Sequence, residues 1–190
     1  MIFILFGKSG VGKSTVYKDL IKYKKYDLTP IVPYTTRPPR PDDIEGTDYH
    51  FISKDQLLEM MVDGDLFEVT KFKVANGDTW YYGTPKADYI SKGDKIIIAN
   101  PFNLRSILKT CRHNKIPAKA IYLYCQSKVS FRRLVNRDDD MKEASRRIDA
   151  DKKDFTKKLI ECAHYKVDTS NMTPKEAGMA VGDIILSEKR

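Results

Sequence analysis

The chain has 190 residues, of which 41% are hydrophobic and 32% charged, and its formal net charge at pH 7 is +8. This length suits one compact domain, and the composition excludes a wholly disordered chain. Apolar runs stay far below the ~20 residues that span a bilayer, and residues 2–6 are too short for the core of a signal peptide. The three cysteines lack CxxC spacing, which favours free thiols. We therefore expect a cytoplasmic protein.

The positive charge raises the question of nucleic-acid binding. However, residues 22–25 and 152–158 alternate lysine with tyrosine or aspartate in helix-like contexts, which favours a solvated helix face. We expect neither a nucleic acid nor a membrane as partner. The sequence leaves a monomer and a homodimer equally open.

Short β-branched runs alternate with segments of helical periodicity, which predicts an α/β fold with three layers, α/β/α, around a central parallel sheet. Three consecutive isoleucines at 96–98 predict a strand that is buried on both faces. The candidate core strands are residues 2–6, 28–32, 95–99, 118–124 and 165–168.

Helix signals fall between these strands. Apolar residues at helical spacing predict a helix over residues 14–24, directly after a glycine-rich turn. Capping boxes at residues 53–56 and 173–176 predict two further helix starts. The second of these helices is expected to cover residues 174–186 and to pack on the core.

Two segments interrupt this alternation. Residues 34–85 are polar, aromatic and rich in Gly and Pro, with strand-like pieces at 49–52, 66–72 and 80–82, and they predict an inserted subdomain. Residues 127–147 carry clustered arginines between helical patterns and predict a helical lid. The core is then expected to comprise residues 1–33, 86–126 and 148–190.

Residues 7–14 have the sequence GKSGVGKS and match the phosphate-loop pattern GxxxxGK(S/T) between a predicted strand and a predicted helix. Glycines let backbone N–H groups point at a phosphate chain, and the start of the helix adds positive potential. Lys13 is expected to contact the β- and γ-phosphates, and the Ser14 hydroxyl to ligate Mg²⁺. ATP or GTP binding is predicted rather than a plain glycine-rich turn. The expected contacts are Gly7, Ser9, Gly10, Val11, Gly12, Lys13, Ser14 and Thr15.

Residues 35–52 have the sequence TTRPPRPDDIEGTDYHFI. This segment resembles the signature of the guanylate kinase family of P-loop nucleoside monophosphate kinases. The order of phosphate loop, acceptor subdomain, arginine-bearing lid and final helix is also similar to that of the family. The matching positions are Thr35, Thr36, Arg37, Arg40, Asp43, Gly46, Tyr49 and Phe51.

Arg37 and Arg40 lie in a stretch stiffened by prolines, so two guanidinium groups are presented with little conformational entropy left to lose. Such groups suit a monophosphate dianion. Tyr49 is expected to donate its hydroxyl to the same phosphate, and so is Tyr82, by its match to the family. Residues 80–81 are expected to pack the subdomain instead.

Recognition of guanine needs acceptors that face its N1–H and N2–H₂ groups. The resemblance implies that Glu68 is that acceptor and that Thr84 aims a hydroxyl at the base. Tyr34 stands where the family usually has serine, and Asn100 lies where the family carries aspartates. The expected acceptor-binding set is Tyr34, Thr36, Arg37, Arg40, Tyr49, Glu68, Tyr82, Gly83, Thr84 and Asn100.

Arginines of the predicted lid resemble those that close over the nucleotide in the family. Arg133 and Arg137 are four residues apart and share one face of a helix, and Arg147 follows in the next helix. For Arg132 and Arg146, ion pairs with acidic residues at 138–140 and 149 are an equal alternative. The expected catalytic set is Lys13, Arg37, Arg133, Arg137 and Arg147.

The resemblance implies transfer of the γ-phosphoryl group of Mg·ATP to GMP or dGMP, giving ADP and GDP or dGDP. No general base is needed, because the acceptor phosphate is already an anionic nucleophile. Two alternatives remain open: a P-loop kinase with a different acceptor, and a non-catalytic guanylate-kinase-like module that binds proteins. The intact phosphate loop and the lid arginines argue against the second.

Overall fold

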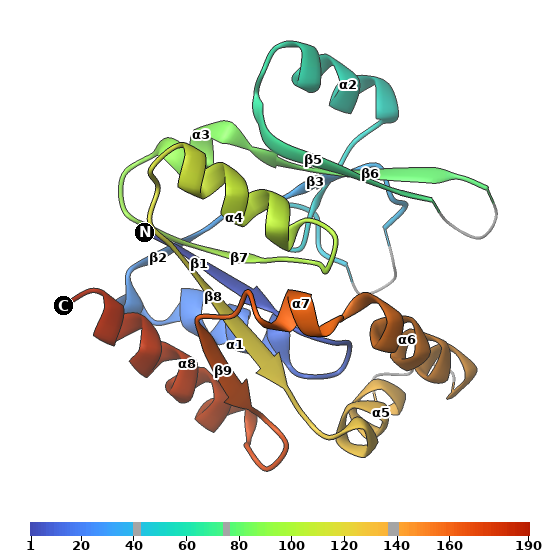
Figure 1. Cartoon of the computed structure of the whole chain (residues 1–190), viewed down its shortest axis with the longest axis vertical. Helices are drawn as coiled ribbons and strands as arrows, with labels where there is room; N and C mark the ends of the chain where they lie inside the picture. Colours follow the sequence, from blue (N-terminus) through green and yellow to red (C-terminus); the bar gives the residue numbers. More distant parts are fainter. Residues whose placement is uncertain (40–42, 74–76, 137–140) are drawn as a thin grey trace.

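The computed structural model describes residues 1–39, 43–73, 77–136 and 141–190. A five-stranded sheet in the order β2-β7-β1-β8-β9 lies at its centre, and every neighbouring pair runs parallel (Figure 1). The predicted α/β class with a central parallel sheet is confirmed. The strands are β1 (Ile2–Phe6), β2 (Leu28–Pro30), β7 (Asp94–Ile98), β8 (Ala118–Tyr124) and β9 (Tyr165–Asp168).

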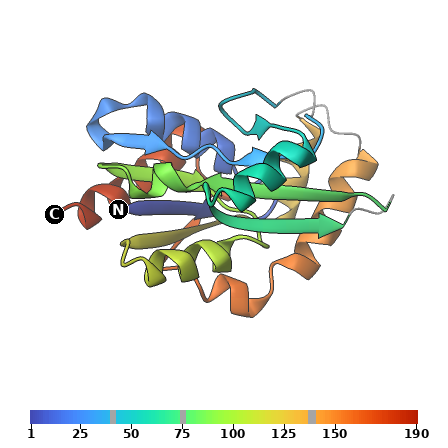
Figure 2. The same cartoon turned by 90° about the horizontal axis from the view of Figure 1, so that it is seen from above.

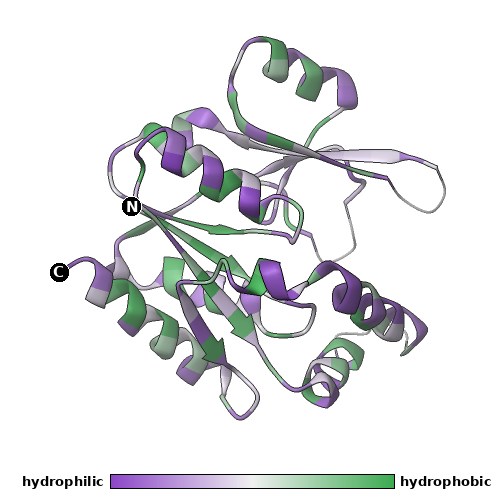
Figure 3. Cartoon of the chain, in the orientation of Figure 1, coloured by the Kyte–Doolittle hydropathy of each residue, from purple (hydrophilic) through white to green (hydrophobic). Residues whose placement is uncertain are grey.

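Helices cover both faces of this sheet, which makes three layers (Figure 2). On one face lie α1 (Lys13–Lys22) and α8 (Pro174–Glu188), and on the other lie α4 (Leu104–His113) and α7 (Lys157–Ile160). A short 3₁₀ helix, η1 (Lys24–Tyr26), follows α1. Hydrophobic residues concentrate on the central strands and the inner helix faces (Figure 3).

Strand β7 shows why the sheet needs both layers. Ile96 is fully buried in the cluster that contains Val16 and Ile185, whereas Ile97 is fully buried in the opposite cluster with Ile107. Side chains of a strand alternate between faces, so neighbouring isoleucines enter different cores. The prediction of a strand buried on both faces is confirmed for these two residues.

Both predicted capping boxes are present. Ser53 and Gln56 exchange side-chain and backbone hydrogen bonds at the start of α2 (Lys54–Val62), and Thr173 and Glu176 do the same at the start of α8. Such caps stabilise a helix by about 1 kcal/mol because they satisfy N–H groups that lack a partner within the helix.

A second, mixed sheet in the order β4-β3-β6-β5 lies beside the carboxyl end of the central one. It contains the three strand pieces expected between residues 34 and 85, but its strand β3 was not predicted, because two residues are too few for a periodic signal. The helix α3 (Lys86–Ile90) returns the chain to the core. The strands are β3 (Tyr34–Thr35), β4 (His50–Phe51), β5 (Leu66–Lys73) and β6 (Thr79–Pro85).

The helices α5 (Ser127–Val135) and α6 (Met141–Asp154) pack against each other at the end of β8. The helical pattern predicted for the arginine-rich segment is present, but α6 continues past residue 147. The expected boundary between lid and core therefore falls inside a helix.

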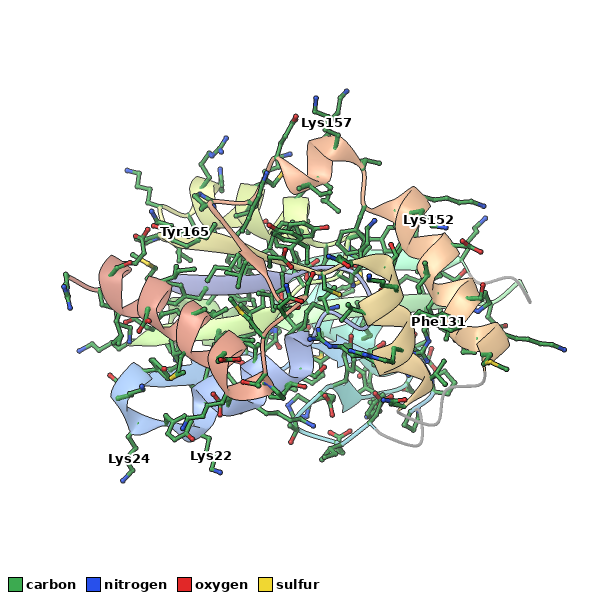
Figure 4. All side chains as sticks on the ribbon, turned by 90° about the horizontal axis from the view of Figure 1, so that it is seen from below. Lys22, Lys24, Phe131, Lys152, Lys157 and Tyr165 are labelled. Carbon is green, nitrogen blue, oxygen red and sulfur yellow. The ribbon has the colours of Figure 1, made fainter. Side chains whose placement is uncertain are left out.

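Surface features agree with the composition. Cys111 is buried, Cys125 and Cys162 are half-buried, and all three are free thiols. The lysines of both basic stretches are exposed, and Lys22 and Lys157 point away from the molecule (Figure 4). Among the described helices, none combines the length and the apolar character that crossing a bilayer requires.

Candidate functional site

The predicted phosphate loop connects the end of β1 to the start of α1. Gly12 is the N-cap of α1 at φ 95°, in the left-handed region that glycine adopts freely. At Gly10 (φ 74°), an added Cβ would lie 2.6 Å from the carbonyl oxygen of Ser130. Only glycine allows this approach, so the loop lies directly against α5. Its position at a helix N-terminus suits an anion.

Lys13 folds back over this loop. Its Nζ donates to the carbonyl oxygens of Gly7 at 2.7 Å and Lys8 at 2.8 Å. The ammonium group is therefore held at the mouth of the loop, where a phosphate chain would lie.

A cavity of about 620 Å³ opens between the phosphate loop, the second sheet and α6. It brings the predicted phosphate loop together with three predicted groups from elsewhere in the chain: Arg37, Tyr49 and Arg147. This volume suits a small-molecule ligand. The lining residues from the loop and α1 are Ser9, Gly10, Lys13, Ser14, Tyr17 and Lys18.

Arg37 is only 5% exposed and is held from several sides. Its Nη2 donates to Oδ2 of Asp43 and its Nη1 to the carbonyl oxygen of Pro38, both at 2.8 Å. The guanidinium also lies 5.3 Å from the ring centroid of Tyr49 and 5.7 Å from that of Phe51. This side chain is preorganised, as predicted for a stiffened arginine. The expectation for Arg40 lies outside the described residues.

Glu68 and Thr84 face each other across the β5–β6 hairpin. The Thr84 hydroxyl, fully buried, donates to Oε1 of Glu68 at 3.3 Å, while Oε2 of Glu68 has no described hydrogen-bond partner. Burial raises the pKa of Glu68 to about 7, although hydrogen bonding by Thr84 and Asn103 works to lower it. The two residues predicted to bind the base, Glu68 and Thr84, therefore lie together, and one carboxylate oxygen of Glu68 has no described hydrogen-bond partner.

Three further predicted acceptor residues lie in the same sheet or directly next to it. Tyr34 stands opposite Gly83, and its ring lies 5.1 Å from that of His50. The ring of Tyr82 lies 5.9 Å from that of Tyr49. Thr36 exchanges hydrogen bonds with the backbone of Tyr81, so its hydroxyl holds β6 in place.

The side chain of Asn100 stabilises the turn after β7. Its Oδ1 accepts from the backbone N–H groups of Phe102 and Asn103, both at 2.9 Å. Asn103 is 2% exposed, and its Oδ1 accepts a hydrogen bond from the backbone N–H of Asn100. The sequence analysis missed Asn103. An asparagine just after a strand and just before a helix was the available signal.

The arginines of α6 share one acidic partner. Arg147 donates to Glu143 at 2.9 Å, and Arg146 makes two hydrogen bonds to the same carboxylate. These arginines lower the pKa of Glu143 to about 2. The alternative pairing of Arg146 with Asp149 is not present, since Arg146 pairs with Glu143 and Asp149 pairs with Lys152. The alternative pairing with residues 138–140 lies outside the described residues. Of the two arginines, only Arg147 lines the cleft.

Arg133 lies on the other side of the phosphate loop. It donates to the Thr169 hydroxyl at 3.2 Å and to the carbonyl oxygens of Thr169 and Met172. With these residues it lines a second cavity of about 220 Å³, together with Val11 and Thr15. The expected grouping of Arg133 with Arg147 is therefore not present in this conformation. The expectation for Arg137 lies outside the described residues.

Asp151 is a further residue that the sequence analysis missed. Its Oδ2 accepts from the backbone N–H of Ser9 at 2.6 Å, which ties α6 to the phosphate loop across 142 residues of sequence. Its place one helical turn after Arg147 was the only signal available.

The described residues contain no group of three or more His, Cys, Asp and Glu side chains that could hold a metal ion. A Mg²⁺ ion that accompanies a nucleotide takes most of its ligands from phosphate and water. The Ser14 hydroxyl lines the cleft at the first turn of α1, and such a donor set fits a nucleotide-borne ion.

Comparison with known proteins gives this geometry a context. The chain is 39% identical to a guanylate kinase of Lactobacillus johnsonii over 87 residues, which are 46% of this chain and 40% of that protein. It is 36% identical to a guanylate kinase of the Aster yellows witches'-broom phytoplasma over 101 residues, 52% of this chain and 46% of that protein. The matches thus span less than half the length of these curated relatives.

A solved structure is similar to this chain over nearly its whole length. The guanylate kinase of Anaplasma phagocytophilum superposes with a TM-score of 0.66 at 18% identity, covering 99% of this chain and 85% of that one. The sequence model of the family described as guanylate kinase matches residues 1–185. Because this match covers nearly the whole chain, the chain belongs to the guanylate kinase family.

Proposed function

We propose that the protein transfers the γ-phosphoryl group of Mg·ATP to GMP or dGMP, giving ADP and GDP or dGDP. The observation that carries this proposal is the 620 Å³ cleft, which unites Lys13 and Ser14 of the phosphate loop with Arg37 and Tyr49, which lie next to strands of the second sheet. A donor phosphate chain on the loop and an acceptor phosphate at Arg37 would then share one cavity.

The donor nucleotide is expected to lie across the phosphate loop. Its triphosphate would accept from the backbone N–H groups at the start of α1 and from Lys13. Its adenosine would occupy the second cavity, whose walls include Arg133, Thr169 and Met172. The two cavities lie on opposite sides of the same loop, which suits a nucleotide whose phosphates pass over it.

The acceptor phosphate is expected at Arg37, Tyr49 and Tyr82. Asp43 holds the Arg37 guanidinium in place before binding. A dianionic phosphate would replace or share this carboxylate, because a guanidinium fork binds either anion through two parallel hydrogen bonds. Arg40 is expected to supply the second fork.

The acceptor base is expected at Glu68 and Thr84. Oε2 of Glu68 is buried without a described partner, and a buried acceptor without a partner costs free energy that a donor on the ligand recovers. Guanine offers N1–H and N2–H₂ side by side, whereas adenine presents an acceptor at N1.

The chemistry requires placement and charge neutralisation more than covalent assistance. Lys13 would hold the transferring phosphoryl group, and Arg147 would approach it from α6 as the cleft closes and water is excluded. Mg²⁺, held by Ser14 and the phosphates, would supply charge neutralisation between the β- and γ-phosphates. The acceptor phosphate oxygen attacks as an anion, so no side chain needs to remove a proton.

A coupled ADP-release assay against all the common nucleoside monophosphates tests this proposal. GMP or dGMP is expected to turn over fastest. Faster turnover of AMP or of a pyrimidine nucleotide would overturn the guanine assignment and leave a kinase of a different acceptor. An absence of turnover with every acceptor would favour the protein-binding module.

One observation favours the different acceptor as the second candidate. Ala99, Asn100 and Pro101 stand where the family carries aspartates, and the Oδ1 of Asn100 is engaged by its own turn. Selectivity for guanine would then depend chiefly on Glu68.

A further inference from the structure

A buried threonine lies directly after β9 and contacts three segments that are remote from one another in sequence. Thr169 is 1% exposed. Its Oγ1 lies 2.9 Å from the carbonyl oxygen of Val11 and 3.2 Å from that of Tyr124. The same Oγ1 accepts from Nη1 of Arg133 at 3.2 Å. The phosphate loop, the end of β8 and α5 therefore meet at this one hydroxyl group.

The geometry shows which carbonyl receives the hydroxyl proton. A threonine hydroxyl has only one proton to donate. The carbonyl oxygen of Tyr124 already accepts from the backbone N–H of Thr169 at 2.8 Å, and it is the more distant of the two from Oγ1. The hydroxyl of Thr169 thus donates to Val11 of the phosphate loop and accepts from Arg133.

This contact fixes the direction of the peptide group that joins Val11 to Gly12. In a trans peptide the C=O and the N–H point in opposite directions, and the described residues contain no cis peptide bond. With its carbonyl on Thr169, the peptide turns the Gly12 N–H away from Thr169. Among the described residues, no hydrogen bond uses that N–H. The donor is therefore left for a ligand anion on the loop.

Gly12 is the reason why this peptide needs to be held. The residue lies at φ 95° and ψ 14°, as the N-cap of α1. Glycine adopts positive and negative φ about equally well, so a peptide group next to it can rotate with little steric cost. A rotated peptide would set a carbonyl oxygen, in place of an N–H, against the phosphate oxygens. The hydrogen bond from Thr169 opposes this rotation.

Arg133 strengthens the same hydrogen bond. Its guanidinium also donates to the carbonyl oxygens of Thr169 and Met172, which holds it at the wall of the 220 Å³ cavity. The chain of donors runs in one sense, from the Arg133 guanidinium to the Thr169 hydroxyl and on to the Val11 carbonyl. Hydrogen bonds in such a chain polarise one another. A charged donor at one end therefore favours the contact with the loop at the other.

We propose that Thr169 is a positioning residue for the donor phosphates, whose hydroxyl holds the peptide between Val11 and Gly12 so that the Gly12 N–H faces the phosphate chain. This inference rests on the part of the proposed function that places a donor nucleotide on the loop. It gives a role in phosphate binding to a residue of the last strand, far in sequence from the loop itself.

Two substitutions test the inference. Thr169→Val keeps the shape of the side chain but removes the hydroxyl, and Thr169→Ser keeps the hydroxyl without the methyl group. Thr110→Val is the matched control, because Thr110 is a half-buried threonine of α4, on the other face of the central sheet. Thermal unfolding shows whether each variant is folded. Initial rates at varied ATP and at varied GMP then give the two KM values.

The KM for ATP is expected to rise by about fivefold to tenfold in Thr169→Val, the cost of one buried hydrogen bond. The KM for GMP is expected to stay within about twofold. Thr169→Ser is expected to keep the KM for ATP within about threefold of wild type, and Thr110→Val within about twofold. Equal rises in both KM values, or a serine variant as impaired as the valine variant, would overturn the inference, because the loss would then come from packing.

A binding measurement without turnover separates this inference from the proposed function. Isothermal titration gives the Kd of Mg·ADP, and competition with ADP gives the Kd of pyrophosphate, which has phosphates but no nucleoside. Thr169→Val is expected to weaken both by about fivefold to tenfold, because the Gly12 N–H binds phosphate. Weaker binding of ADP with unchanged binding of pyrophosphate would overturn the role of the loop peptide. Weaker binding of both by a protein that turns over no GMP would support the role of Thr169 and contradict the proposed function.

Discussion

Lys13 shows how a single side chain is prepared for a ligand. Its ammonium group is satisfied by the carbonyl oxygens of Gly7 and Lys8, so the residue is ordered before a phosphate arrives. Binding a phosphate chain then adds a contact to a positioned charge and loses little side-chain entropy.

Replacing Lys13 with alanine is expected to abolish most phosphoryl transfer while the fold remains. Loss of one preorganised electrostatic contact lowers kcat by about 10²–10³-fold. The measurement is steady-state ADP release together with thermal unfolding. Lys22→Ala, at the other end of the same helix, is the control because its side chain is exposed and points away from the molecule (Figure 4). Near-normal turnover by folded Lys13→Ala would contradict the assignment of the loop.

Glu68 gives the expected dependence on pH. Its pKa is raised to about 7, so the carboxyl group is largely protonated below that value and ionised above it. The ionised form accepts from guanine, whereas the protonated form offers an O–H donor to N1 of adenine. We expect kcat/KM for GMP to rise with pH through about 7, and selectivity for GMP over AMP to fall as the pH falls. Stopped assays with each acceptor at about pH 6 and pH 8 measure both.

The same raised pKa has a consequence for stability. A carboxyl group whose folded pKa lies above its ordinary value near 4.5 destabilises the folded protein as the pH rises through the interval up to about 7. Glu68→Gln is therefore expected to stabilise the protein more at about pH 8 than at about pH 5, while it removes the pH dependence of selectivity. Thermal unfolding at the two pH values checks this. An equal change in stability at both pH values would contradict a raised pKa of the buried Glu68 carboxyl group.

At the scale of elements, α6 contributes Arg147 to the wall of the cleft. Arg147 and Arg146 share Glu143, yet only Arg147 lines the cavity. Arg147→Ala is expected to lower kcat by more than tenfold with a smaller rise in the KM for GMP, because contacts completed on closure act mainly in the transition state. Arg146→Ala is the matched control and is expected to keep kcat within about twofold. Equal effects of the two substitutions would make Arg147 a surface residue.

Asp151 connects α6 to the phosphate loop. Asp151→Asn keeps the shape of the side chain but weakens its acceptor for the N–H of Ser9, so we expect the KM for ATP to rise severalfold with little change in the KM for GMP. Asp149→Asn is the control, because Asp149 lies on the same helix and pairs with exposed Lys152. Initial rates at varied ATP measure the effect. An unchanged KM for ATP would show that the loop keeps its conformation without α6.

Elements with strong local signals are the ones that the sequence predicted well. β1 and β8 match their expected bounds because each is a run of mainly apolar residues, and β9 matches its expected bounds although its sequence is mixed. The start of α8 was also predictable, because its capping box joins two residues that are only three positions apart in the sequence. The length of α6 was not predictable, because its second half is fixed by a contact between Asp151 and Ser9 that is remote in sequence.

At the scale of the whole molecule, the two cavities lie on opposite sides of one loop. Lys13 and Ser14 face the large cavity, and Val11 and Thr15 face the small one. The parallel sheet makes this possible, since the loop and the turn after β7 both leave its carboxyl edge, where ligands of α/β proteins bind.

The site was predictable where a motif fixes residues in order, as in the phosphate loop and the segment that holds Arg37 and Tyr49. It was not predictable where the fold brings distant residues together. Asp151 meets Ser9, and Thr169 meets Arg133, only after the central sheet and the helices are packed. Sequence spacing carries no record of such contacts.

The protein is expected to hold a donor triphosphate and GMP in one cleft and to transfer a phosphoryl group from the first to the second. Phosphorus-31 NMR of the protein with ATP, Mg²⁺ and GMP tests it directly, because it identifies the products as well as the rate. ADP and GDP are expected to form in equal amounts, only when GMP is present, with no inorganic phosphate. ADP formed together with inorganic phosphate, or an unchanged GMP signal in a folded protein, would contradict the claim.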